Sequence, residues 1–340
     1  MNITFFVGNG FDLNLGLKTD YASFLKYHKD KKCDDIISQS INQNITLWAD
    51  LERQLGTITR EATDENIEAF IESKCAIDES LSDYLSGINN SNDVIFGDKG
   101  AVEFRDRLIS FSKEFSETEV MHYDSIVKNA DATIRYRFVS FNYTSFLDRI
   151  ISKAKMLNPF SSHSAKNTSF SDCIEEPIHA HGTLADNVLL GVNDISQLEG
   201  TENVKKRLAP YMLKPDMNTA LGRQTISHIK EIINSSQYII VYGMSLGETD
   251  LIWWKYLSEW LKAAQSRRLV LHVYDQGITS KSGTRTLRLQ DKKRNQFIQI
   301  SQCKNPEISR QIIIVANSKI FTYNTIHVRA QQTDERAEAV

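Results

Sequence analysis

ITFFVGNGFDLNLG, residues 3–16, is the stretch that decides the fold. Ile3–Val7 is short, β-branched and aromatic, which is typical of a buried first strand, and a glycine turn follows directly. Glycines there let the backbone approach a ligand and direct N–H groups at a diphosphate. The G-x-G-x-x-G fingerprint is incomplete, because Leu13 holds its last position. The alternative to a ligand site is a tight strand-to-helix turn. The candidate nucleotide-binding residues here are Gly8, Asn9, Gly10, Phe11 and Asp12.

Strand-like runs recur later in the chain, at Arg137–Phe141, Ile178–Gly182, Val188–Val192, Tyr238–Tyr242 and Leu269–Tyr274. The last two follow helical stretches, and near-continuous apolar runs suit strands that are buried on both faces. Strands that alternate with helices predict an α/β fold with a doubly wound, Rossmann-like parallel sheet. The Ser- and Asn-rich segment Asn158–Asp172 is expected to be a mobile loop.

The region from about residue 21 to residue 129 has a different pattern. Apolar residues recur there at helical spacing, as in Ile45, Trp48, Leu51 and Leu55. This predicts a large helical insertion after the first strand. We assign residues 1–330 to a single α/β domain that carries the insertion. The polar end of the chain, residues 331–340, is expected to be a flexible tail.

Composition limits the class of protein. With 340 residues, 41% of them hydrophobic, the chain can bury a core that needs no disulfide or metal. Its net charge of -3 gives no global basic field, so nucleic acid is not an expected partner. The four cysteines form no CxxC or Cys/His pair, which indicates a reducing compartment and no zinc cluster. No signal peptide or membrane span is apparent, so we expect a cytoplasmic protein without a membrane partner.

Ligands of open parallel sheets bind outside the carboxyl ends of the strands, so residues that follow strands are candidates. Asn142 follows one predicted strand, where its amide can recognise another amide or hold a water. The alternative is that Asn142 caps a helix beginning near Ser145. Strand alternation puts His179 and His181 on one face. His181, beside Gly182, suits general-base work near neutral pH, and the alternative is a histidine held by core hydrogen bonds.

A second glycine turn follows YIIVY and contains Gly243 and Ser245. The Ser245 hydroxyl is available to a phosphate or a ribose. Asp250 lies early in the next helix, where a carboxylate also stabilises the helix N-terminus. Asp275 ends the run LVLHVY, where an acid can meet a ribose on the adenine side of a ligand.

Together these motifs resemble the site of the sirtuins. Gly8, Gly10, Asp12 and Gly16 resemble the glycine-rich loop, and Phe141-Asn142-Tyr143 the catalytic asparagine motif. His181-Gly182 looks like the catalytic His-Gly, and Gly243-Met244-Ser245-Leu246 like the turn under the cofactor phosphates. Asp12 replaces a serine and Lys18 a proline, and the four-cysteine zinc module is missing. More narrowly, GNGFDLNLGLKTDYASF, LWADLE, SFNYTSF, IHAHG and VYGMSLGETD resemble the AbiH family of phage abortive-infection proteins over nearly the whole chain.

The resemblance implies an anti-phage effector that hydrolyses NAD+, its substrate, to nicotinamide and ADP-ribose without a metal. Asn142 would orient the carboxamide or the attacking water, and His181 would act as base. The Gly8–Gly10 loop and Ser245 would hold the diphosphate. Asp12 would contact a ribose hydroxyl, and its alternative role is helix capping. Loss of NAD+ would halt phage growth. The insertion would serve regulation by a phage-derived trigger or by contacts in a homo-oligomer.

Two other functions stay open. One is a nucleotide-sensing module that binds NAD+ or a derived nucleotide and signals by oligomerising, since a shared fold does not transfer a reaction. The other is a nuclease toxin, which the basic stretch Lys281–Arg294 suggests. A solvated charge run also explains that stretch.

Overall fold

The computed structural model describes residues 1–91, 94–279, 283–323 and 327–328. The strands are β1 (Asn2–Val7), β2 (Val94–Ile95), β3 (Arg135–Ser140), β4 (Ser161–Ala165), β5 (Thr168–Ile174), β6 (Ile178–His179), β7 (Tyr238–Tyr242), β8 (Arg268–Val273), β9 (Ile312–Ala316) and β10 (His327–Val328). The helices are α1 (Gly10–Asn14), α2 (Tyr21–Asp30), α3 (Ile36–Gln43), α4 (Leu51–Ile58), α5 (Ile67–Asn89), α6 (Asp98–Ile109), α7 (Glu117–Lys128), α8 (Phe146–Lys155), α9 (Glu202–Met212), α10 (Lys214–Ala220), α11 (Thr225–Ser235), α12 (Leu251–Lys262) and α13 (Gly283–Ile300). Within the described ranges, no helix combines the length and the apolar character that a membrane crossing needs.

The central sheet has the order β4-β5-β3-β1-β7-β8-β9, and β6 pairs with β3. Strand β1 pairs in parallel with β3 and β7, with Phe5 opposite Phe138 and Ile240. Strands β8 and β9 continue the parallel part. The β4–β5 pair is antiparallel, so the sheet is mixed, and it is not closed into a barrel. The predicted α/β class with a central sheet is confirmed, whereas the prediction of an all-parallel sheet is wrong.

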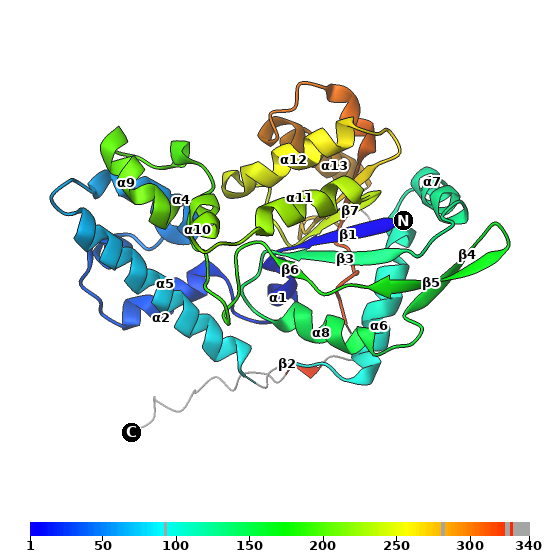
Figure 1. Ribbon diagram of the computed structural model, residues 1–340, viewed down its shortest axis with the longest axis horizontal. Coiled ribbons are helices and arrows are strands. Elements are labelled where there is room, and N and C mark those ends of the chain that lie inside the picture. Colours follow the sequence, from blue (N-terminus) through cyan, green and yellow to red (C-terminus); the bar gives the residue numbers. More distant parts are fainter. Residues whose placement is uncertain (92–93, 280–282, 324–326, 329–340) are drawn as a thin grey trace.

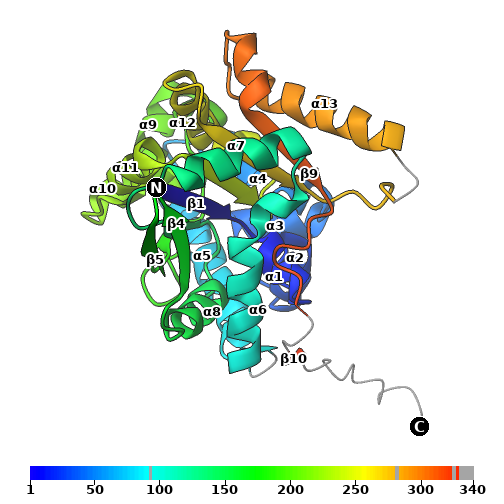
Figure 2. The ribbon, with the colours of Figure 1, turned by 90° about the vertical axis from the view of Figure 1, so that its right-hand side faces the viewer.

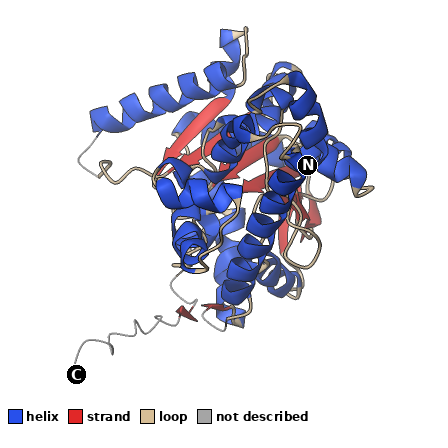
Figure 3. Ribbon diagram, turned by 90° about the vertical axis from the view of Figure 1, so that its left-hand side faces the viewer, coloured by secondary structure: helices blue, strands red, loops and turns tan. Residues whose placement is uncertain are grey.

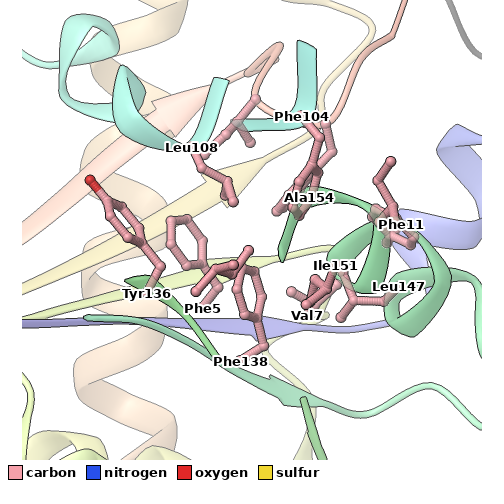
Figure 4. Packing of buried hydrophobic residues seen from close by; sticks show 14 of the residues in the cluster. Phe5, Val7, Phe11, Phe104, Leu108, Tyr136, Phe138, Leu147, Ile151 and Ala154 are labelled. Carbon is pink, nitrogen blue, oxygen red and sulfur yellow. The ribbon is translucent and has the colours of Figure 1, made fainter. Parts of the chain in front are cut away.

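Helices cover both faces of the sheet, as Figures 1 to 3 show. On one face, Ile3 and Phe5 of β1 pack with residues of α6 and α8. Figure 4 shows this core, in which the rings of Phe5 and Phe138 stack with centroids 5.2 Å apart. On the other face, Phe6 joins a cluster with α11 and α12. Because β1 is buried on both faces, four of its six residues are apolar, and the polar Thr4 is buried as well.

Between β1 and β3 the chain is mostly helical. Helices α2 to α5 pack with α9 around their own hydrophobic cluster, which includes Trp48 and Phe70. In Figure 1 this group lies to the left of the sheet. The assignment of residues 1–330 to one domain stays a prediction. The expected flexible tail, residues 331–340, lies outside the described residues.

Two predictions about local structure are wrong. The segment expected to be a mobile loop contains most of the β4–β5 hairpin, whose two-residue turn has Lys166 and Asn167 at φ of 49° and 62°. Positive φ at both central residues is the geometry of a type I′ turn, which matches the twist of the strands that it joins. Conversely, Val188–Val192 is not a strand, and only an isolated bridge joins Val192 to Leu213.

Candidate functional site

The glycines of the two predicted turns contact each other. The Gly8 N–H donates to the Tyr242 carbonyl and the Gly10 N–H to the Gly243 carbonyl, each at 2.9 Å. A Cβ on Gly10 would lie 2.4 Å from the Gly243 Cα, and Gly243 has a φ of +70°. The close approach of two backbones therefore accounts for these glycines, and protein carbonyls accept their N–H groups. The diphosphate cradle stays a prediction that the glycines alone do not support.

Asn9 and Phe11 also serve the local structure. The Asn9 side chain accepts from the Thr19 hydroxyl at 2.6 Å and donates to the Thr19 carbonyl at 3.0 Å. Phe11 is fully buried, and its ring packs edge-on against Phe321. The Asn9 bonds fix the start of α1 against the segment that leads into α2, and the Phe11 ring packs α1 against Phe321.

A cavity of about 90 Å³ lies where β1 and β3 end. Its polar wall comes from the residues that follow these two strands, and it brings together Asn9, Asp12 and Asn142 from the predicted site. Its other wall belongs to the helical insertion. The cavity is lined by Asn9, Asp12, Thr19, Tyr21, Leu81, Leu85, Phe141, Asn142, Tyr143 and Thr144.

Asp12 is the buried acid of this cavity, with 1% of its surface exposed. Its Oδ1 accepts from Asn142 Nδ2 at 3.1 Å, and its Oδ2 accepts from the Thr144 hydroxyl. Burial raises the pKa of Asp12 to about 7, although these two hydrogen bonds favour the ionised form. Its carboxylate therefore bonds across to the segment after β3 and does not cap a helix. An acid with this pKa can exchange a proton at neutral pH.

Asn142 has one half of its amide fixed and the other half free. Its Nδ2 donates to Asp12, while its buried Oδ1 has no partner among the described residues. Its backbone carbonyl accepts from His179 Nδ1 at 2.9 Å, and His179 Nε2 meets Asp148 at 3.0 Å. Asn142 therefore does not cap α8, which begins at Phe146. A buried carbonyl oxygen beside a cavity suits a ligand that presents an N–H or O–H donor.

His181 lies behind this cavity wall. Strand β6 ends at His179, so strand alternation does not reach His181, which lies in the turn that follows. Its buried ring contacts Phe141 edge-on at 5.3 Å between centroids and lies 6.4 Å from the Tyr143 ring. Both of these aromatic residues line the cavity, whereas His181 does not.

The ring of His181 belongs to a cluster of charged side chains. Lys214 Nζ lies 3.4 Å from both ring nitrogens and 2.7 Å from Glu52 Oε1. Asp250 Oδ1 lies 3.9 Å from His181 Nε2. Burial and then the Lys214 cation lower the pKa of His181 well below its ordinary value, so the ring is neutral. The alternative stated for His181 from the sequence was a histidine held by hydrogen bonds in the core. Its buried contact with Lys214 agrees with that alternative in part.

Asp250 is the last residue of the short 3-10 helix η5 (Glu248–Asp250), which leads into α12. Its Oδ1 is buried and has no hydrogen-bond partner among the described residues, although 16% of the side chain is exposed. Burial raises the pKa of Asp250 to about 7, and Lys214 opposes the rise. Asp250 is therefore a second acid that titrates near neutral pH.

The other predicted residues do not line the cavity. Gly182 has a φ of +77°, and a Cβ there would lie 2.1 Å from the Asn187 carbonyl oxygen, so backbone packing explains this glycine. Ser245 is exposed, and Leu246 is half-buried. The Asp275 carboxylate accepts from the Gly277 N–H at 2.8 Å and so stabilises its own turn. Contacts of these residues with a ligand stay predictions.

The basic stretch Lys281–Arg294 falls mostly on α13, and residues 281–282 lie outside the described ranges. Of that helix, only Leu289 and Phe297 are buried. This is typical of a solvated charged helix and gives no support to a nuclease site.

Sequence reasoning missed Tyr21, Glu52, Thr144 and Lys214. Thr144 lies within the quoted motif SFNYTSF, beside Asn142. Glu52 lies on the buried side of α4 with Leu51 and Leu55, and an acid on an apolar helix face indicates a buried partner. Nothing in the sequence distinguishes Lys214 from the exposed lysines.

A family model described as bacteriophage abortive infection AbiH matches residues 4–272. This range contains all residues of the cavity and of the charged cluster, and it ends before Asp275. A search among curated proteins gave no match.

Proposed function

The chain belongs to the AbiH family of bacteriophage abortive-infection proteins, and on this premise we propose that it is an anti-phage protein that hydrolyses NAD+ to nicotinamide and ADP-ribose. The observation that carries the proposal is the unpartnered Oδ1 of Asn142 beside the cavity, with the amide held by Asp12. The carboxamide of nicotinamide has the N–H donor that this oxygen lacks.

The sheet topology supports a nucleotide ligand. Strand β1 lies between β3 and β7. The chain therefore passes from β1 to β3 on one side of it and later returns to β7 on its other side. Ligands of open α/β sheets bind in the crevice at such a switch point, outside the carboxyl ends of the strands. We infer that the sheet serves as a doubly wound, Rossmann-like and sirtuin-like nucleotide scaffold, with the reacting end of NAD+ at Asn142.

In the proposed reaction the bond between ribose C1′ and the pyridinium nitrogen breaks, and its electron pair neutralises the nicotinamide. Positive charge develops on the ribose, and the ionised carboxylate of Asp12 stabilises it. A water oxygen then bonds to C1′ and loses one proton. Asp12 is our first choice as acceptor, because it lines the cavity and has a pKa of about 7. His181, the base expected from the sequence, is the second choice, because its ring lies behind Phe141 and Tyr143.

The cavity is too small for a whole dinucleotide, and this suggests a role for the insertion. Pockets for small ligands usually measure ~300–1,000 Å³, whereas this cavity measures about 90 Å³. It therefore fits only a small part of a dinucleotide. Entry of NAD+ requires displacement of Tyr21 on α2 and of Leu81 and Leu85 on α5, all of which belong to the insertion. We infer that the insertion is a lid and that an infection signal opens it.

Chromatography of NAD+ incubated with the purified protein, with and without lysate of phage-infected cells, tests the proposal. We expect release of nicotinamide and ADP-ribose that Asn142→Ala abolishes and the exposed control Asn203→Ala retains. NAD+ that stays bound without product under both conditions would favour the sensor. Neither binding nor release would contradict the site.

A further inference from the structure

Four titratable side chains from separate segments meet behind the cavity. They are Glu52 on α4, His181 after β6, Lys214 on α10 and Asp250 in η5. Lys214 is 1% exposed, His181 6% and Glu52 7%. Tyr21 links this cluster to the cavity, because it lines the cavity and its hydroxyl donates to Glu52 at 3.1 Å.

A buried ion pair is a poor means of stabilising a fold, because desolvation of both charges offsets their attraction. Well-packed apolar side chains of similar volume would serve as well. Perturbed titratable groups that gather beside a cavity are typical of functional sites. A role in the chemistry of the neighbouring cavity therefore explains this cluster better than a contribution to stability does.

This role concerns the two ring nitrogens of His181, which have different neighbours. Nε2 of His181 is the nitrogen that lies 3.9 Å from Asp250 Oδ1. Lys214 Nζ is equally far from both ring nitrogens, at 3.4 Å, so its charge opposes a second proton on the ring without selecting one nitrogen. The Asp250 carboxylate lies on the Nε2 side and favours the tautomer with its proton on Nε2.

We propose that Lys214, anchored by Glu52, is a positioning residue of the NAD+ site that keeps His181 neutral, with its proton on Nε2 facing Asp250. The proposal rests on the proposed function for its role in turnover, but not for the state of the ring. The charges of Lys214 and Glu52 cancel, and the neutral ring adds none. Asp12 and Asp250, when ionised, then supply the net charge, which is complementary to a cationic N-glycoside such as the pyridinium riboside of NAD+.

The groups that face His181 come from several elements. Lys214 and Asp250 are the charged ones, Tyr143 packs on the ring, and Glu52 and Tyr21 lie behind Lys214. Loss of the Lys214 cation leaves Asp250 as the nearest charge. The imidazole then loses a repelling cation while Asp250 still faces Nε2, and this favours its protonation.

NMR of the unliganded protein with labelled histidines tests the state of the ring, with His181→Gln to assign its signals. We expect His181 to stay neutral from pH 5 to pH 8, and to be the Nε2–H tautomer at pH 8, where Asp250 is ionised. In Lys214→Met its pKa should rise by at least ~1 pH unit. The exposed control Lys206→Met should match the original protein. If Lys214→Met does not fold, Lys214→Met/Glu52→Gln makes the same comparison without an unpaired acid. An unchanged titration of His181 in the folded variant would overturn the proposal.

Turnover supplies the second test. The activity of Lys214→Met relative to the original protein should be lower at pH 6 than at pH 8, because His181 takes up a proton more readily in the variant. A ratio that does not vary with pH would overturn the role in turnover. If the original protein does not hydrolyse NAD+, the proposed function fails, and the NMR titration still decides the positioning role.

Discussion

Asp12→Asn should stabilise the protein and abolish turnover. Burial raises the pKa of Asp12 from 3.8 to about 7. At ~1.4 kcal/mol for each pH unit, the ionised carboxylate then costs the folded state on the order of 4 kcal/mol at pH 8. Asparagine has the same shape and no charge. Its amide oxygen can accept from Asn142, and its NH2 can donate to the Thr144 oxygen, so both contacts survive.

Proton linkage determines how the stability of the protein changes with pH. Between pH 3.8 and about 7, unfolding releases the proton that folded Asp12 holds, so the stability of the original protein falls as the pH rises through this window and then levels off. Asp12→Asn has no such dependence. The stability gained by the variant should therefore be larger at pH 8 than at pH 5, by ~2–3 kcal/mol.

Urea unfolding at pH 5 and pH 8 measures this difference, with the exposed Asp124→Asn as the matched control. The assay of NAD+ turnover at pH 8 measures the loss of activity in the same preparations. An equal gain in stability at both pH values would refute the buried, titrating carboxylate. Full activity of Asp12→Asn would refute its assignment as base.

Three further predictions follow from the same geometry. Turnover should rise with pH through about 7 as Asp12 ionises, and a kcat/KM profile that is flat from pH 5.5 to 8.5 would contradict this. Thr144→Val removes a hydrogen bond that favours ionised Asp12, so the midpoint of that profile should move to higher pH; a move to lower pH would show that the bond acts otherwise. Gly10→Ala should lower the unfolding free energy by at least ~2 kcal/mol, because its Cβ would lie 2.4 Å from the Gly243 Cα. The control Gly87→Ala has open space around its Cβ and should raise the unfolding free energy by ~0.5–1 kcal/mol. Urea unfolding measures both changes.

Much of the central sheet was predictable from local sequence. The runs at β1, β7 and β8 are largely apolar because these strands are buried on both faces, and their bounds lie close to the predicted ones. Strand β3 begins two residues before its predicted run, and its first half carries the polar Arg135 and Arg137. The β4–β5 hairpin was missed because its strands are polar and its turn, Lys166-Asn167, lacks glycine. We did not predict β9 either, although its run IIIVA is strongly apolar.

The candidate site was predictable only in part. Asn142 and Asp12 were each found from their position after a strand, but their hydrogen bond joins residues 130 positions apart. The Lys214–Glu52 pair spans 162 positions and links two helices whose packing no local pattern encodes. The turn glycines were identified correctly as special positions. Glycine is needed at these positions because the two turns contact each other. The sequence of one turn does not show that contact.

The most direct test of the central claim is the amount of nicotinamide that the purified protein releases from NAD+, measured by mass spectrometry before and after addition of lysate from phage-infected cells. We predict release with an equal amount of ADP-ribose in at least one condition, and its loss in Asn142→Ala and Asp12→Asn. No release in either condition, or release that both variants retain, would contradict the proposal that this cavity hydrolyses NAD+.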